Sequence, residues 1–311
     1  MAVAEKDDAF ANVNLKAYVL LVGTTLCWGG NAVLSRMAVG EISPMLLVTL
    51  RWAGALLLML VFAGNAIRRD WCVLRRHVPY LAIMGILGFT AFNSIFYVAA
   101  HGTTAVNIGI IQGAIPVFVL LGAFLADRTP VALLQAAGVA LTLAGIVIVA
   151  TRGSPWHLLA LAVNWGDALM VVAASVYAIY AVGLRRRPAV SSLGLFTALA
   201  GIAFVASLPL SAAEWVTGRA QWPTATGWWV VALVTVFPSF LAQIFFLQGV
   251  ALIGPGRAGV FINLVPLFAS VMAVVVLGEP FALYHALALA LVLAGIALSE
   301  RHSPKVEKRK S

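Results

Sequence analysis

Several amide side chains stand within long apolar stretches of the sequence, and the ones considered for an interior site are Asn31, Asn93, Gln112, Gln243 and Asn263. An amide both donates and accepts hydrogen bonds, so it can bind an ammonium group or a carboxylate without selecting a sign of charge. In an apolar helix such a group is costly unless it meets a partner or water, so its position marks the interior of a bundle. Each amide can equally serve only to join two helices, and both interpretations stay open.

Aromatic and hydroxyl side chains recur at helical spacing beside these amides. Trp28, Asn31 and Ser35 form one stripe, and Asn93 and Tyr97 belong to another in which polar or aromatic residues recur every four positions. Aromatic rings can stack on a solute, or they can only fill gaps between helices. The candidate solute-binding residues are therefore Trp28, Asn31, Asn93, Tyr97, Gln112, Tyr177, Tyr180, Ser239, Gln243, Phe246 and Asn263.

Charged groups are almost absent from the middle of the apolar stretches. The acidic residues Glu41, Asp127, Asp167 and Glu279 fall at their ends, and we therefore expect an interior with no fixed counter-ion. Arg51 is the most buried charge, and an arginine deep in hydrocarbon costs roughly 2.5 to 3.5 kcal/mol, or less if it snorkels. We expect Arg51 to be mainly a structural anchor, with a contact to a substrate carboxylate as the alternative.

The residue types that would support catalysis or metal binding do not gather at one depth. The five histidines are scattered over loops and different apolar stretches, and the two cysteines, Cys27 and Cys72, are too few for a metal site or a disulfide framework. We expect neither an enzyme nor a cofactor. The net charge of +9 comes from basic residues in loops, so we expect no nucleic-acid partner.

The elements that must position these side chains are membrane-spanning helices, because 62% of the residues are hydrophobic and the mean hydropathy is +1.01. Apolar stretches of about 20 residues can cross a bilayer, and lipid offers no partner to an open strand edge. The predicted fold is an all-α integral membrane protein. Its ten expected spans are Lys16–Met37, Pro44–Gly64, Pro79–Ala100, Thr104–Ala126, Pro130–Ala150, Asn164–Leu184, Ser191–Ala213, Gly227–Val250, Gly256–Leu277 and Pro280–Ser299.

The distribution of Lys and Arg predicts the orientation of these spans. Basic residues concentrate in the loops that share a side with the N-terminus, such as Arg68 and the run Arg185–Arg187, so we expect both termini in the cytoplasm. The first span follows an acidic start and lacks a convincing cleavage site, so we expect a retained helix and not a signal peptide. The spans 130–150 and 280–299 are nearly bare of polar residues and are expected at the periphery.

The chain resembles itself at an offset of 150 residues, which pairs Pro116 with Pro266 and Pro130 with Pro280. A five-helix unit crosses the membrane an odd number of times, so two copies, residues 1–152 and 153–311, must be inverted with respect to each other. Inverted repeats are typical of secondary transporters, whose site lies near the midplane. We expect a central cavity, with helices kinked at Pro116, Pro266 and Pro238.

Four segments resemble the EamA branch of the drug/metabolite transporter superfamily. They are "LCWGGNAVLSR", "PMLLVTLRWAGALLL", "GAIPVFVLLGAFLADRTPVALLQAAGVALTLAGIVIV" and its repeat "NLVPLFASVMAVVVLGEPFALYHALALALVLAGIAL". Within it the chain looks most like the YddG-type aromatic amino-acid exporters. The resemblance implies broad amino-acid export across a bacterial inner membrane by alternating access. Export of other amphiphilic metabolites or drugs, and lipid flipping, are the alternatives. The expected partners are a small-molecule substrate and the lipid bilayer. We expect solute transport that is not coupled to an ion, and a protein that is a monomer or a homodimer.

Overall fold

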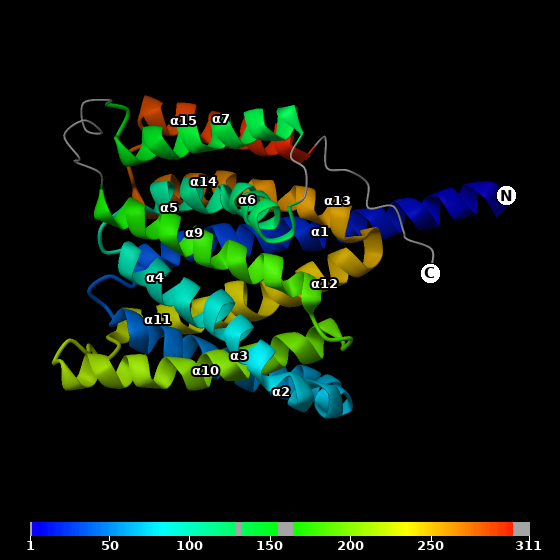
Figure 1. Cartoon of the computed structure of the whole chain (residues 1–311), viewed down its shortest axis with the longest axis horizontal. Helices are drawn as coiled ribbons and strands as arrows, with labels where there is room; N and C mark the ends of the chain where they lie inside the picture. The colour runs from blue at the N-terminus through cyan, green and yellow to red at the C-terminus, as the bar shows by residue number, and fades with distance from the viewer. Residues whose placement is uncertain (1, 129–131, 155–163, 301–311) are drawn as a thin grey trace.

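The computed structural model describes residues 2–128, 132–154 and 164–300, and within them every regular element is helical. The helices α1 to α15 and the short helices η1 to η5 follow one another along the chain (Figure 1). Their bounds are α1 (Ala2–Met37), α2 (Pro44–Leu74), η1 (Arg75–His77), α3 (Val78–Gly85), η2 (Ile86–Ala91), α4 (Phe92–Ala99), α5 (Ala105–Gly113), α6 (Ile115–Asp127), α7 (Leu133–Ala150), α9 (Trp165–Gly183), η3 (Leu184–Arg186), α10 (Ser192–Val216), α11 (Ala225–Val234), η4 (Thr235–Leu241), α12 (Ala242–Ile253), α13 (Pro255–Phe261), η5 (Ile262–Leu264), α14 (Val265–Leu277) and α15 (Leu283–Glu300).

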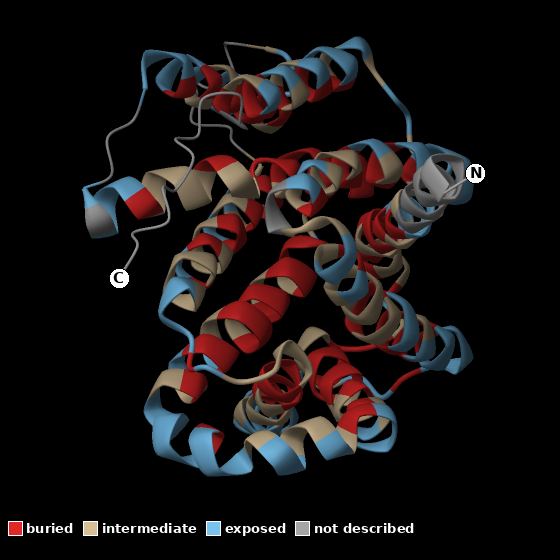
Figure 2. Ribbon diagram, turned by 90° about the vertical axis from the view of Figure 1, so that its right-hand side faces the viewer, coloured by how far each residue is buried: buried red, intermediate tan, exposed pale blue. Residues whose placement is uncertain are grey.

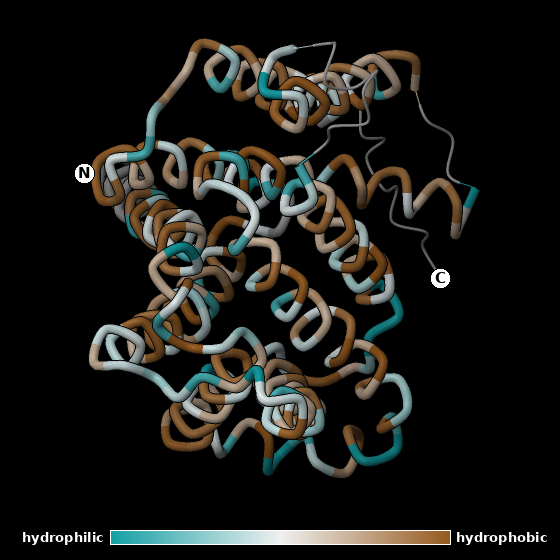
Figure 3. Tube along the Cα trace, turned by 90° about the vertical axis from the view of Figure 1, so that its left-hand side faces the viewer, coloured by the Kyte–Doolittle hydropathy of each residue, from teal (hydrophilic) through white to brown (hydrophobic). Residues whose placement is uncertain are grey.

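Eight helical segments among the described residues are long and apolar enough to cross a membrane, and a ninth, Leu283–Ser299, is apolar but shorter. Large apolar side chains cover the outside of the bundle, as Phe62 at 71% exposure and Leu283 at 86% illustrate. Hydrophobic residues make up most of the helices, while hydrophilic residues lie mainly in the connections between them (Figure 3). Lipid is the solvent that such a surface requires, so this is a multi-pass membrane protein.

The second and third expected spans form one helical run of 56 residues, Pro44–Ala99. We expected the first of them to end at Gly64, but α2 continues to Leu74 and a 3-10 turn, Arg75–His77, joins it directly to α3. The residues after Gly64 include no proline before Pro79, so nothing in the backbone stops the helix when the apolar pattern ends.

Two pairs of helices form opposite edges of the bundle. Helix α7 packs against α15 at one edge and α2 packs against α10 at the other, with α1, α5, α9 and α14 between them (Figure 1). The peripheral position expected for spans 130–150 and 280–299 is confirmed, although Pro130 itself lies outside the described residues. Buried residues concentrate on the helices between the edges (Figure 2).

Carboxylates cap the α2–α10 pair at both ends. Asp70 near the end of α2 accepts a 2.9 Å hydrogen bond from the backbone N–H of Ser191, the N-cap of α10. Glu214 near the end of α10 accepts 3.1 and 3.2 Å hydrogen bonds from the N–H groups of Met45 and Leu46 at the start of α2. Negative charge is favourable at a helix N-terminus, so the two caps fix an antiparallel register.

The paired prolines lie at interruptions of their helices. Helix α5 ends at Gly113 and α6 starts at Ile115, which places Pro116 in a first turn; Pro266 lies likewise in the first turn of α14, after the 3-10 turn η5. A proline in a first turn removes no hydrogen bond that the helix needs. At both places the α-helical pattern is interrupted by a short turn, while the helical run continues from Ala105 to Ala126 and from Arg257 to Leu277. A Cβ added to Gly113 would lie 2.7 Å from Cγ of Pro266, so the two turns meet where α5 packs on α14.

Two π-helical segments, η2 and η4, interrupt the helices that carry Asn93 and Gln243. Pro238 lies inside η4, and Gly88 holds the position 150 residues earlier inside η2. A π-helical turn leaves a backbone carbonyl without its usual i+4 donor, so a side chain can bond to it. The kink expected at Pro238 is therefore a π-helical turn, and it recurs in η2 without a proline.

Candidate functional site

Arg51 lies at the centre of the polar group that the structure builds inside the bundle. It is the eighth residue of α2, about 10 Å from the helix start, and only 5% of it is exposed. Its Nε donates a 2.6 Å hydrogen bond to Oγ of Ser239, and its Nη1 lies 2.6 Å from the hydroxyl of Tyr97 and 2.8 Å from Oδ1 of Asn93. Oδ1 of Asn31 is 3.3 Å from the same Nη1. Four candidate residues from three other segments therefore meet on one guanidinium group, which we call the Arg51 group.

The acceptors of the Arg51 group are themselves held in place. Tyr97 donates a 3.3 Å hydrogen bond to Oδ1 of Asn31, and Nδ2 of Asn93 donates to the backbone oxygen of Phe89 at 2.6 Å. The hydroxyl of Ser239 donates at 2.6 Å to the carbonyl of Val234, five residues earlier, which the π-helical turn leaves available. Each acceptor oxygen therefore faces the guanidinium in a fixed orientation.

The Arg51 group contains a charge that has no acidic partner among the described residues. The ion pairs found there are Arg36–Glu279 and Arg69–Asp70, and neither involves Arg51. We expected no fixed counter-ion in the interior; the structure places a positive charge there, because α2 brings the guanidinium to the amides and does not let it snorkel to the surface. The ring of Trp52, 5.2 Å from the guanidinium carbon, and the ring of Tyr97 at 5.9 Å contribute π-faces to the same cation.

Trp28 and Phe246 form an aromatic pair beside the Arg51 group. Their ring centroids are 5.4 Å apart, and both side chains are half-buried. Trp28 precedes Asn31 by three residues on α1, and α1 packs against α12, the helix that carries Phe246. The pair therefore lies about one helical turn from the amide that contacts Arg51.

Tyr177 and Tyr180 belong to a second aromatic group on α9. Tyr177 packs against Phe92 at 5.0 Å between ring centroids, and Tyr180 packs against Phe89 at 5.5 Å. Within the described residues no hydrogen bond joins either tyrosine to Arg51. These two candidates therefore pack against phenylalanine rings and do not bond to the guanidinium.

The remaining amide candidates lie near the helix interruptions. Gln112 is half-buried at the end of α5, and in the described part of the chain its Oε1 is sealed without a hydrogen-bond partner. Asn263 is half-buried in the η5 turn before Pro266, and Gln243 is half-buried on α12, four residues after Ser239. Neither glutamine bonds to Arg51, so their role as ligands stays a prediction.

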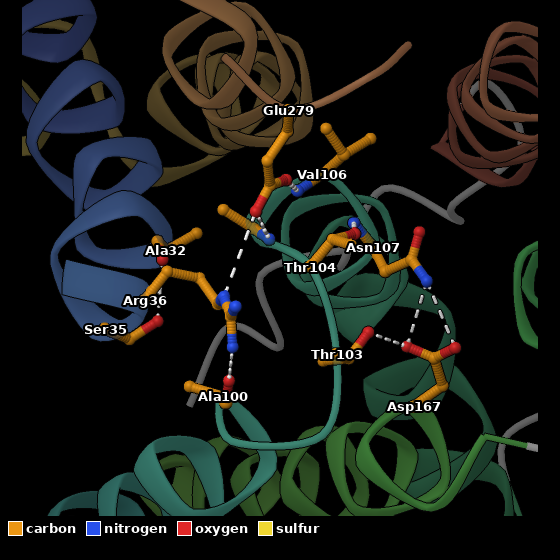
Figure 4. Close-up of polar contacts among 11 residues, drawn as sticks. Ala32, Ser35, Arg36, Ala100, Thr103, Thr104, Val106, Asn107, Asp167 and Glu279 are labelled. Carbon is orange, nitrogen blue, oxygen red and sulfur yellow. Dashed lines mark hydrogen bonds and ion pairs between the residues drawn. The ribbon is translucent and has the colours of Figure 1, made fainter. Parts of the chain in front are cut away.

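A second polar cluster lies around the connection between α4 and α5, and we call it the loop-end cluster (Figure 4). Glu279 accepts hydrogen bonds of 2.8 and 3.0 Å from the N–H groups of Ala105 and Val106, and lies 3.9 Å from Nε of Arg36. The sequence placed Glu279 at the end of a span but gave no sign that it caps another helix. Its position before Pro280, after the left-handed Gly278, is the signal that it leaves the helix.

The loop-end cluster also includes α9. Asp167 in the first turn of α9 is fully buried, accepts 3.2 and 3.1 Å hydrogen bonds from Nδ2 of Asn107, and receives another from the hydroxyl of Thr103. Nη1 of Arg36 donates to the backbone oxygen of Ala100. The connection between α4 and α5 is thereby bonded to α1, α9 and the residue that follows α14 (Figure 4).

A sequence model of the EamA-like transporter family matches the chain twice, over residues 15–151 and 164–301. The chain belongs to this family. Three curated relatives are named as uncharacterized transporters. YyaM of Bacillus subtilis (strain 168) is 25% identical over 91% of this chain and 93% of its own; YetK of the same organism is 25% identical over 90% and 85%. A protein of Archaeoglobus fulgidus is 26% identical over 92% and 98%.

A solved crystal structure has the same fold, with a TM-score of 0.62 and 20% identity over 93% of this chain and 97% of the other. The curated relatives are named as transporters, which agrees with the membership of this chain in the EamA-like family. Within the described residues no group of three or more metal-ligating side chains is close enough to hold a metal ion.

Proposed function

We propose that this transporter exports amino acids, aromatic and other, across a bacterial inner membrane without coupling to an ion. The Arg51 group carries this proposal, because it combines hydrogen-bond acceptors, a guanidinium and aromatic faces in the interior of an otherwise apolar bundle. A zwitterionic solute needs partners for both of its charges, and amide and hydroxyl oxygens supply those for an ammonium group. Trp28 and Phe246 offer aromatic faces to an apolar side chain.

The proposed architecture is ten crossings in two inverted five-helix repeats, with Pro44–Ala99 crossing twice. The packing supports it: the contact of α1 with α12 has its counterpart in that of α9 with α4, and the contact of α1 with α14 in that of α9 with α6. Local features repeat at the same offset. Gln135 and His285 each accept from the N–H three residues earlier, and Arg128 and Gly278 both end a helix in the left-handed conformation.

Alternating access follows if the two repeats exchange conformations around the Arg51 group. The loop-end cluster supports this step, since it bonds the α4–α5 connection to three other segments. The repeat places the α12–α13 connection opposite it, and there Arg257 donates a 2.7 Å hydrogen bond to Tyr18. In the proposed cycle the loop-end cluster faces away from the cytoplasm and must separate before solute is released.

Flux of labelled amino acids in proteoliposomes tests the proposal. We expect phenylalanine flux above that of empty vesicles, competed by other amino acids more strongly than by a lipophilic cation or a nucleotide sugar. Flux should not depend on an imposed proton or sodium gradient. Absence of flux for every member of a broad amino-acid panel would contradict the proposed substrate class, and competition by a lysolipid instead would favour lipid transport.

A further inference from the structure

The terminal nitrogen Nη2 of Arg51 differs from the other nitrogens of this guanidinium. Nε and Nη1 bond to Ser239, Asn31, Asn93 and Tyr97. Within the described residues Nη2 donates no hydrogen bond. It is also not one of the fully buried side-chain nitrogen and oxygen atoms that lack a partner, so part of its surface is accessible. A guanidinium has five N–H donors, and the two on Nη2 are the ones left over.

We propose that Nη2 of Arg51 binds the carboxylate of the transported solute, and therefore that a carboxylate is required in the substrate. This inference rests on the proposed function and goes further, because amides and hydroxyls alone would not select an anionic group. A guanidinium is planar and matches a carboxylate with directed, charge-assisted hydrogen bonds. Among the described residues, Nη2 of Arg51 has no hydrogen-bond partner on that plane.

The charge balance of the site supports an anionic ligand. Arg51 is 95% buried, counted from its exposure of 5%, and neither ion pair among the described residues includes it. A buried charge without a counter-charge is destabilising, and neutral oxygens compensate it only in part. A bound carboxylate would supply the missing negative charge where the protein supplies none.

The other half of the chain has an apolar residue at the position that matches Arg51. Helices α2 and α10 both follow an N-cap serine, Ser43 and Ser191, and they pack against each other at one edge of the bundle. When the two serines are superposed, the counterpart of Arg51 is Leu199, which is buried at 2% exposure. An apolar side chain therefore fills the matching place, and a purely structural requirement would not account for a charge in only one repeat.

The neighbours of Arg51 define what else the solute should carry. Trp28 precedes Asn31 on α1 by about one helical turn. Gln243 and Phe246 on α12 follow Ser239 by about one and two turns. The aromatic pair thus lies within about one to two helical turns of the residues that hold Arg51. The fitting class is a small carboxylate with an apolar or aromatic group close to it.

The test compares phenylalanine with two analogues in purified wild-type protein. 2-Phenylethylamine lacks the carboxylate and 3-phenylpropionate lacks the amine. We expect 2-phenylethylamine to compete with phenylalanine flux at least tenfold more weakly than unlabelled phenylalanine, and 3-phenylpropionate to raise the melting temperature of the protein. Equal competition by the amine and the amino acid would overturn the proposal, and this result needs no variant.

Arg51→Gln should bind phenylalanine and 2-phenylethylamine within about twofold of each other, while Arg51→Lys should keep part of the preference. Arg257→Gln is the matched control, because it removes an arginine that bonds to a tyrosine outside the Arg51 group, and it should keep the wild-type preference. If wild-type protein moves no amino acid, the proposed function fails separately, and stabilisation by 3-phenylpropionate then decides the carboxylate site. Stabilisation that is equal in wild type and Arg51→Gln would overturn it.

Discussion

The hydroxyl of Tyr97 lies 2.6 Å from Nη1 of Arg51 and 3.3 Å from Oδ1 of Asn31. It accepts from the guanidinium and donates to the amide, so one phenol group joins α4 to both α1 and α2. The side chain is fully buried and packs edge-on against Phe96, with 5.6 Å between the ring centroids. Tyr97 therefore holds Arg51 in its orientation in this structure.

Tyr97→Phe should weaken substrate binding and leave the protein folded. A hydrogen bond to a charged group contributes about 1.5 to 3 kcal/mol, and two oxygens remain for Nη1, so we expect the lower end of that range. This corresponds to a rise of roughly tenfold in the KM for phenylalanine flux. The measurement is concentration-dependent flux in proteoliposomes containing equal amounts of each protein.

The matched control is Tyr18→Phe. Tyr18 also accepts from an arginine, at 2.7 Å from Nη2 of Arg257, but it is 39% exposed and lies more than three helical turns before Asn31 on α1. Its KM should stay within about twofold of wild type, since an exposed hydrogen bond is exchanged for one with water. Equal effects of the two substitutions would remove Tyr97 from the solute site.

The helical spacing of Asn93 and Tyr97 correctly placed both on one face, because four residues make about one turn and the helix is regular from Phe92 onward. The role of Arg51 could not be obtained in the same way. A single arginine in an apolar stretch has the same sequence signature whether it snorkels or turns inward, and the difference is made by Asn31, Asn93 and Ser239 from other helices. The spacing of Tyr177 and Tyr180 also places both on one face of α9, but there it did not predict their partners. Their rings pack against Phe92 and Phe89.

Gly88→Ala should destabilise the protein through the π-helical segment η2. A Cβ at this position would lie 2.5 Å from ring carbons of the buried Tyr180, so the ring or the helix must move. Overpacking of this kind costs typically 1 to 3 kcal/mol, about several degrees of melting temperature. Gly64→Ala on α2 is the control, because no atom lies within 4 Å of the added carbon there. Its melting temperature should not fall.

The fold class and the peripheral helices could be predicted because each depends on a property of a single stretch of sequence. These properties are the length of the apolar stretch and its lack of polar residues. Pro116 and Pro266 predicted distorted helices, but not the form of the distortion, which is a short turn inside a continuing helical run. A proline in the sequence shows where a backbone hydrogen bond is missing, but the local geometry of the helix depends on the side chains that pack there. Here Gly113 closely approaches Pro266. The π-helical turn at Gly88 has no proline and left no local signal.

The proposed inverted arrangement makes a labelling prediction. Asp70 on α2 bonds to Ser191, and Tyr80 donates a 3.1 Å hydrogen bond to the carbonyl of Gly183, so the ends of α2 and α9 lie together. The exposed thiol of Cys72 and a cysteine at Ala189, also exposed, should therefore react with an impermeant maleimide from the cytoplasmic side.

Arg219→Cys should react from the opposite side, because α10 separates Arg219 from Ala189 and is long enough to cross the bilayer. Each cysteine is introduced into a Cys27→Ser, Cys72→Ser background, and Cys72 is tested with only Cys27 replaced. Labelling of Cys72 and the cysteine at position 189 from different sides would contradict the proposed topology.

Glu279→Gln should loosen the loop-end cluster. The carboxylate accepts from the N–H groups of Ala105 and Val106 and faces Arg36, so the amide loses the charge that favours both contacts. A loss of about 1 kcal/mol in the closed arrangement raises the open population roughly fivefold. A cysteine at Val106, which is fully buried, should then be labelled from outside about five times faster than in the wild-type background.

Glu214→Gln separates this opening from general instability. Glu214 caps α2 through two backbone N–H groups at 3.1 and 3.2 Å, as Glu279 caps α5, but it forms no ion pair among the described residues and lies outside the loop-end cluster. Both substitutions should lower the melting temperature to a similar extent, because each weakens one charged helix cap. Only Glu279→Gln should speed labelling at position 106, because only that cap closes the α4–α5 connection. If Glu214→Gln speeds it equally, the exposure reflects unfolding of the bundle, and the loop-end cluster is not a gate.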